Sequence, residues 1–161
     1  MTKRHKIVIG MVLAMIWSVV IVWLPQTMKA PFMPLNAVII TALLPGGLVM
    51  VLLIGALGFR RFFDASAIDG APFEVGTGGD IDQRVLINTA EQILLSAVLW
   101  PFVALTLGGL VTLWLGVGFA VARLAFWIGY HISPPLRAFG YGATFYPTVL
   151  ATLWALAVWM F

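Results

Sequence analysis

The chain has 161 residues, of which 62% are hydrophobic and 9% are charged, and its mean hydropathy is +1.06. Soluble proteins carry about 25% charged residues, so this composition predicts an integral membrane protein rather than a soluble enzyme. The net charge of +3 comes from basic residues scattered between apolar segments, and the chain has no cysteine and only two histidines, which excludes a nucleic-acid-binding stripe, a disulfide or a thiolate metal site.

The first predicted element is an apolar helix over Ile7–Leu24, which follows Lys3, Arg4 and Lys6. A basic start followed by an apolar run is also typical of a secretory signal peptide. This run is long, however, and the next residues, QTMKAPF, contain no small-x-small cleavage site. We therefore expect a retained transmembrane helix, which with its linker occupies residues 1–34.

Four further stretches reach the length of about 20 apolar residues that a transmembrane helix needs. The short link around Thr106–Gly109 predicts that two of these helices form an antiparallel hairpin. The predicted fold class is all-α, an integral membrane bundle with a four-helix domain in residues 35–161 behind the extra N-terminal helix. The four expected helices are Leu35–Phe59, Arg84–Leu105, Gly109–Tyr130 and Leu136–Met160.

The stretch Asp64–Asp82, DASAIDGAPFEVGTGGDID, separates two of the predicted helices and is rich in glycine and aspartate. Its GTGG follows no predicted strand and opens no helix in the pattern that a dinucleotide-binding fold requires. We therefore expect a flexible connector rather than a nucleotide site.

The basic residues indicate how the chain is oriented, because lysine and arginine gather in cytoplasmic loops. With the N-terminus inside, every basic residue except Lys29 falls at the cytoplasmic end of one of the five predicted spans. We therefore expect a protein of a bacterial inner membrane whose polar helix ends, and any site they form, face the cytoplasm.

The segment DQRVLINTAEQ places polar residues at the start of a membrane helix. At about 100° per residue, Arg84, Asn88 and Glu91 share one narrow stripe, which becomes apolar deeper in the helix. These groups either pair with one another at the membrane interface, or they face the bundle interior, where ionisable residues usually mark a site.

A second polar stripe ends the next predicted helix, where Arg123, Trp127 and Tyr130 lie on one face. Aromatic residues of this kind also form the belts that anchor membrane proteins at the interface. The stripe alone therefore leaves a binding site and an aromatic belt as alternatives.

The last predicted helix begins at SPPLR, where Ser133 is a suitable cap and Pro134 suits the first helical position. Arg137 then lies in the first turn, next to the positive end of the helix dipole, where a cation is unfavourable unless an anion is nearby. The alternative is an arginine that reaches out to a lipid phosphate.

These patterns together resemble those of the MAPEG family, membrane-associated proteins in eicosanoid and glutathione metabolism. The resemblance rests on the R-x-x-x-N-x-x-E pattern of Arg84, Asn88 and Glu91, on ARLAFWIGYHISPPLR, and on RRF at Arg60 to Phe62. It covers about residues 35–161 and implies a four-helix subunit in a homotrimer, with glutathione bound between subunits near the cytoplasmic face.

The resemblance also implies roles for individual residues. Arg137 matches the arginine assigned to thiolate activation, with Tyr130 as a further hydrogen-bond donor. Two positions differ from the family pattern, since Phe126 stands where several family enzymes have a tyrosine and Leu86 where some have a polar residue. The residues implied to hold glutathione are Arg60, Arg84, Asn88, Glu91, Gln92, Arg123 and Tyr130.

The chemistry of glutathione suits this set, because two carboxylates and a thiolate pair well with guanidinium groups and Glu91 can accept the ammonium. The apolar part of the stripe suits a lipophilic electrophile that arrives from the bilayer. We therefore expect a membrane glutathione transferase or peroxidase-like protein. The alternatives are a catalytically silent structural or assembly subunit whose arginines bind anionic lipid, and a small transporter, for which the spans offer few polar residues.

Overall fold

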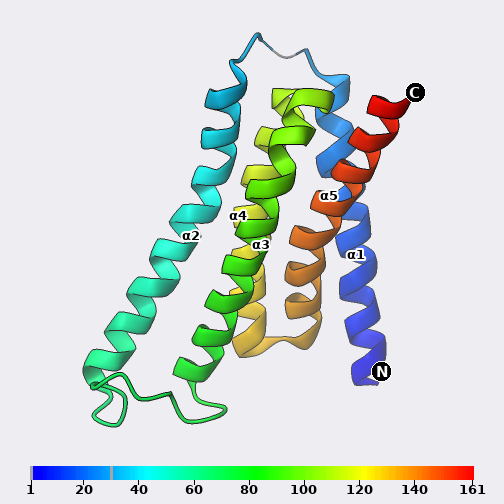
Figure 1. Cartoon of the computed structure of the whole chain (residues 1–161). Coiled ribbons are helices and arrows are strands. Elements are labelled where there is room, and N and C mark those ends of the chain that lie inside the picture. The colour runs from blue at the N-terminus through cyan, green and yellow to red at the C-terminus, as the bar shows by residue number, and fades with distance from the viewer. Residues whose placement is uncertain (1, 30) are drawn as a thin grey trace.

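The computed structural model describes residues 2–29 and 31–161, so Met1 and Ala30 lie outside the described residues. In this part of the chain the structure is all-α, with no strand, and five long helices are each apolar enough to span a membrane (Figure 1). The predicted fold class, an integral membrane helical bundle, is confirmed. The elements are α1 (Lys3–Trp23), a 3-10 turn η1 (Leu24–Thr27), α2 (Leu35–Phe63), α3 (Gly78–Leu107), α4 (Gly109–Ile132) and α5 (Pro134–Met160).

The connector between α2 and α3 is shorter than the sequence predicted. Helix α2 continues to Phe63 rather than ending at Phe59, and α3 begins at Gly78 rather than at Arg84. The cause lies in the cap: Thr77 accepts a hydrogen bond from the Asp80 backbone N–H at 3.4 Å, and Asp80 stabilises the first turn. GTGG thus lies at the start of a helix, but no strand precedes it among the described residues, so the strand–turn–helix pattern of a dinucleotide-binding fold is absent there.

Helices α3 and α4 form the predicted hairpin, with Gly108 as the single residue between them. Gly108 has a φ of 94°, a backbone conformation that favours glycine because it has no Cβ. The two helices consequently run antiparallel, and the end of α4 returns to the end of the bundle where α3 begins (Figure 1).

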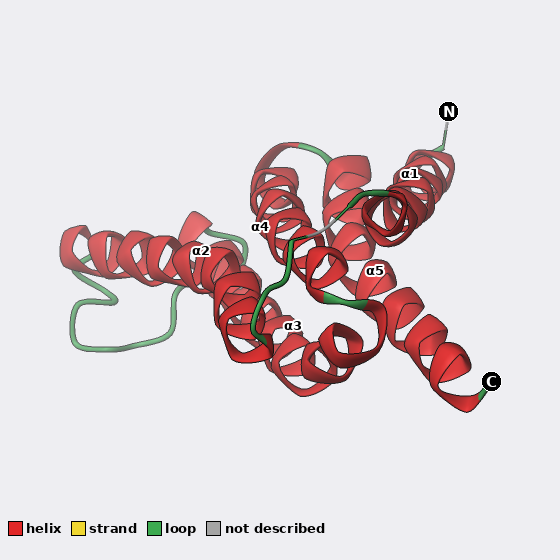
Figure 2. Cartoon of the chain, turned by 90° about the horizontal axis from the view of Figure 1, so that it is seen from above, coloured by secondary structure: helices red, strands yellow, loops and turns green. Residues whose placement is uncertain are grey.

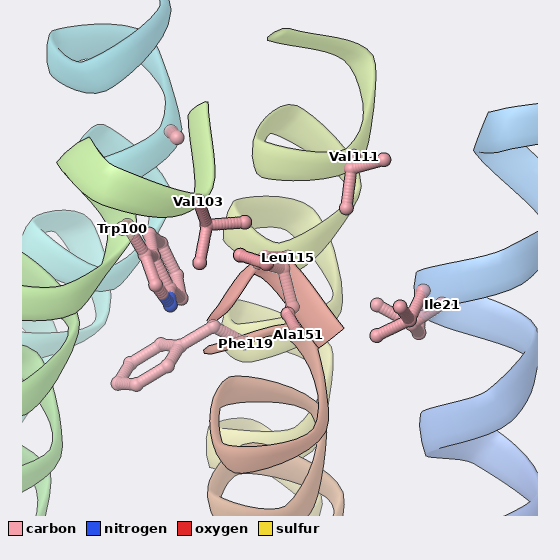
Figure 3. Close-up of a cluster of buried hydrophobic side chains, with 10 residues drawn as sticks. Ile21, Trp100, Val103, Val111, Leu115, Phe119 and Ala151 are labelled. Carbon is pink, nitrogen blue, oxygen red and sulfur yellow. The ribbon is translucent and has the colours of Figure 1, made fainter. Parts of the chain in front are cut away.

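The main core cluster is made of buried apolar residues, most of which come from α3, α4 and α5, with further residues from α1 and α2. Figure 3 shows Trp100, Leu115 and Phe119 converging there, with the Trp100 and Phe119 rings edge to face at 6.0 Å. The Trp100 ring N–H donates to the Thr148 hydroxyl at 3.3 Å, which satisfies a polar atom far from water. This packing fixes the three helices against one another.

Helices α1 and α2 lie on opposite sides of the bundle, with α1 packed along α5 (Figure 2). The start of α1, the end of α2, the start of α3 and the turn from α4 to α5 all lie at one end of the bundle (Figure 1). This arrangement brings together the polar helix ends that the sequence placed on one side of the membrane.

Candidate functional site

A buried arginine connects the polar residues of three helices. Arg123 on α4 has no exposed surface, and its guanidinium donates to the Asn88 side-chain oxygen on α3 at 2.8 Å and to the Thr144 hydroxyl on α5. The guanidinium also lies 4.5 Å from the centre of the Phe126 ring. Asn88 in turn donates to the Glu91 carboxylate at 3.2 Å. The orientation of Asn88 is therefore fixed from both sides.

Arg84 does not join this network, although it shares the helix stripe with Asn88. Its guanidinium pairs with Asp80 one turn earlier, at distances of 3.0 Å to both carboxylate oxygens, and its side chain is 55% exposed. Of the pairing within the stripe that the sequence left as one alternative, the structure contains the Asn88–Glu91 contact, whereas Arg84 pairs with Asp80.

Arg137 and Tyr130 line a cleft of about 440 Å³ at the polar end of the bundle. The Arg137 guanidinium lies 4.9 Å from the centre of the Tyr130 ring, which packs edge to face on Phe126. Within the described part of the chain, Arg137 has no carboxylate at salt-bridge distance. The cleft lining consists of Ile7, Met11, Asn88, Phe126, Tyr130, Arg137, Ala138, Tyr141 and Tyr146.

Arg137 lies in the first turn of α5, as the sequence predicted. Ser133 precedes the helix and Pro134 occupies its first position, but the Ser133 hydroxyl makes no capping hydrogen bond. The free N–H groups of the first turn therefore add positive potential beside the guanidinium. A positively charged, half-buried position of this kind is suited to an anionic ligand.

Sequence reasoning missed Asp82, which it treated as the end of the connector. The Asp82 carboxylate has no exposed surface and accepts hydrogen bonds from Arg60 at 2.6 Å and Trp127 at 2.7 Å, and His131 Nε2 lies 2.7 Å away. This cluster joins the polar ends of α2, α3 and α4. The sequence pattern gave no signal for it, because the predicted helix began at Arg84 and the partners of Asp82 lie on other helices.

Arg60 also borders a separate, open cleft of about 730 Å³ beside the loop that joins α2 to α3. Asp64 lies at its edge, and the pKa of this carboxyl is lowered because the Ser66 hydroxyl and backbone N–H both donate to it. Among the described residues, no group of three or more histidine, aspartate or glutamate side chains is placed to hold a metal ion.

The structure brings together only some of the predicted site residues. Asn88, Tyr130 and Arg137 line one cleft, Arg123 lies behind Asn88, and Glu91 is bound to Asn88. Gln92 is buried, whereas Arg60 and Arg84 are held elsewhere by aspartates. Sequence reasoning also missed Tyr141, whose position four residues after Arg137 places both on one face of α5.

Comparison with known proteins adds one finding. The model of the MAPEG family matches residues 37–157, which begin within α2 and end within α5. No curated protein and no solved structure matches the chain. The matched range contains every lining residue of the smaller cleft except Ile7 and Met11, which come from α1.

Proposed function

The chain belongs to the MAPEG family, and on that premise we propose that it is a membrane-bound glutathione transferase or peroxidase-like protein. It activates the thiol of glutathione for attack on a lipophilic electrophile. The observation that supports this function best is the Arg137 guanidinium, which lines the cleft beside Tyr130 without a carboxylate partner among the described residues.

The activation step follows from the charge of Arg137. A free thiol has a pKa of about 8.5, so only a small fraction is ionised at neutral pH. A guanidinium and a helix N-terminus beside the sulfur stabilise the thiolate, and each unit by which the thiol pKa falls corresponds to about 1.4 kcal/mol. Tyr130 donates a hydrogen bond to the same sulfur, and water takes the released proton.

The remaining predicted residues hold the tripeptide. Asn88 lines the cleft, and Glu91, which is exposed, accepts the ammonium of the γ-glutamyl group. Arg123 has no surface for the ligand and acts by fixing Asn88. The other proposed glutathione-binding residues are Arg60, Arg84 and Gln92. When glutathione binds, each arginine exchanges its aspartate partner for a glutathione carboxylate.

A homotrimer explains why Arg84 and Glu91 lie apart from the cleft that contains Arg137. Arg84 and Glu91 lie outside the cleft of their own chain and on an exposed face of α3. In the proposed trimer, glutathione binds between neighbouring subunits, so that this face of one subunit meets the cleft of the next. Residues 35–161 form the domain that trimerises, and residues 1–34 add one helix with its linker.

We place the site at the cytoplasmic face of a bacterial inner membrane, because the basic residues gather at that end of the bundle. In this proposal glutathione reaches the site from the cytoplasm, and the electrophile enters the cleft from the bilayer.

The alternative is a catalytically silent membrane protein whose arginines bind anionic lipid head groups. Two observations favour it: Arg60 and Arg84 are already paired with aspartates, and Phe126 lacks the hydroxyl that several family enzymes carry.

Calorimetry on the detergent-solubilised protein distinguishes the two functions. Glutathione should bind in preference to α-Glu-Ala-Gly, a tripeptide with the same net charge but with neither the γ-linkage nor the thiol. Equal affinity for both peptides would favour the lipid-binding alternative.

A further inference from the structure

We propose that α1 forms one wall of the cleft and that Ile7 and Met11 set the size of the lipophilic group that the site accepts. This inference rests on the proposed glutathione transferase function and deepens it, because it names the part of the chain that selects the second substrate. Both residues lie outside the range that the family model matches.

Two residues of α1 belong to the lining of the cleft. Ile7 and Met11 are four residues apart on α1, so they lie on one helix face and one turn apart. They contribute apolar surface to a cleft whose other residues include the polar groups of Asn88, Tyr130 and Arg137. A cleft that is charged at one part and apolar at another suits an amphipathic molecule.

Helix α1 also packs closely against α5. A Cβ on Gly10 would lie 2.3 Å from the Pro135 backbone oxygen, so the two helices are in close backbone contact there. Ala14 and Ser18, at successive turns, are also buried, and the Trp17 ring meets the Phe139 ring edge to face at 6.2 Å. Small residues allow such close helix packing in membranes.

Because α1 packs closely on α5, its backbone cannot approach the cleft further, so the side chains of Ile7 and Met11 determine the width of the cleft at this wall. Ile7 and Met11 are separated along the axis of α1 by about one helical turn, which rises about 5.4 Å. A straight aliphatic chain can extend along α1 and contact both residues. A branched or bulky group would clash with their side chains.

Straight-chain α,β-unsaturated aldehydes fit this shape and require no further reactant. The sulfur of the thiolate forms a bond to the β-carbon, and the π-electron pair moves toward the carbonyl. The α-carbon then takes a proton from water. The addition has no leaving group and needs no oxidant or reductant.

Two matched substitutions on α1 test the role of Met11. Met11→Trp fills the cleft, so the ratio of kcat/KM for dodecenal to that for hexenal should fall by about tenfold. Met15→Trp lies one turn further along α1 on an exposed position outside the cleft, so this ratio should stay at the parental value. An unchanged ratio in Met11→Trp overturns the inference.

A photolabelling experiment separates failure of this inference from failure of the proposed function, and it does not require turnover. The probe is an S-alkyl glutathione with a diazirine at the end of its alkyl chain, and mass spectrometry identifies the labelled peptide. Label on the Ile7–Met11 segment that free glutathione prevents supports the inference. Label that glutathione prevents but that lies only on other helices overturns the inference alone, whereas label that glutathione does not affect overturns the proposed function as well.

Discussion

At the scale of single residues, Arg123 is a charged group with no exposed surface in a membrane bundle. A buried charge is costly unless it is hydrogen-bonded, and Arg123 makes these bonds to Asn88 and Thr144. Asn88 is the hydrogen-bonded partner of Arg123 that lines the cleft, so we expect the buried arginine to affect a ligand through the orientation of Asn88.

A double-mutant cycle tests this dependence. Arg123→Met should weaken glutathione binding by about 1 to 2 kcal/mol, because Asn88 loses the bond that orients it. Asn88→Ala should cost a similar amount, and the double variant should bind no more weakly than Asn88→Ala alone. Calorimetry provides the three affinities, and additive losses would show that Arg123 acts independently of Asn88.

Arg84 and Leu86 should give opposite results in binding and stability measurements. The Arg84 ion pair is exposed, so Arg84→Ala should cost less than about 1 kcal/mol of stability but weaken glutathione binding by about 2 to 3 kcal/mol. Leu86 packs against the buried cluster around Leu53 and Phe126, so Leu86→Ala should lower the unfolding temperature and leave binding unchanged. If the two variants lose the same binding energy while the protein remains folded, the stripe has been assigned to the wrong face.

The sequence could predict which residues share a helix face but not which partner each one takes. Helical periodicity placed Asn88 beside Glu91, and the structure contains that contact. Arg84 lies on the same stripe, yet its long side chain turns back to Asp80. The burial of Asp82 depends on Arg60, Trp127 and His131, which lie on other helices, and periodicity along one helix cannot provide those contacts.

At the scale of helices, the spans were predictable because length and hydropathy alone determine whether a helix can cross a membrane. The helix ends were less predictable, since the start of α3 depends on the Thr77 cap and on Phe73, whose ring leaves no room for a Cβ on Gly79. The docking of α1 on α5 depends on backbone contacts that hydropathy does not reveal.

The contact between α1 and α5 should be sensitive to a single methyl group. Gly10→Ala places a Cβ against the Pro135 oxygen and should destabilise the protein by about 1 to 3 kcal/mol, measured as a lower unfolding temperature in detergent. Gly55→Ala on α2 is the matched control, because a Cβ there meets no atom within 4 Å. That variant should be neutral or slightly more stable, and equal losses in both would contradict the docking of α1.

At the scale of the whole molecule, the residues of the proposed glutathione site do not all meet within one chain. One chain gathers Asn88, Tyr130 and Arg137 in its cleft and leaves Arg84 and Glu91 on an exposed face of α3. The same helix exposes the apolar residues Leu94 and Val98, which face either lipid or another subunit. A homotrimer with the site between subunits accounts for both observations.

Native mass spectrometry and reporter fusions test this arrangement. The protein should leave the detergent micelle as a trimer, and fusions at the N-terminus and within residues 64–77 should both report the cytoplasmic side. A fusion at Lys29 is the control and should report the opposite side. A monomer that still binds glutathione, or an external signal from residues 64–77, would contradict the proposal.

In the proposed function Arg137 converts bound glutathione to its thiolate, and the ultraviolet absorbance of the thiolate measures this conversion directly as pH is varied. In the parent protein, the thiol of bound glutathione should titrate below its solution pKa. In Arg137→Leu that shift should shrink by about one unit or more, whereas Arg4→Leu, an exposed arginine outside the cleft, should behave as the parent. If the bound thiol titrates at its solution pKa in the parent protein, Arg137 has no role in activating glutathione and the proposed function is wrong.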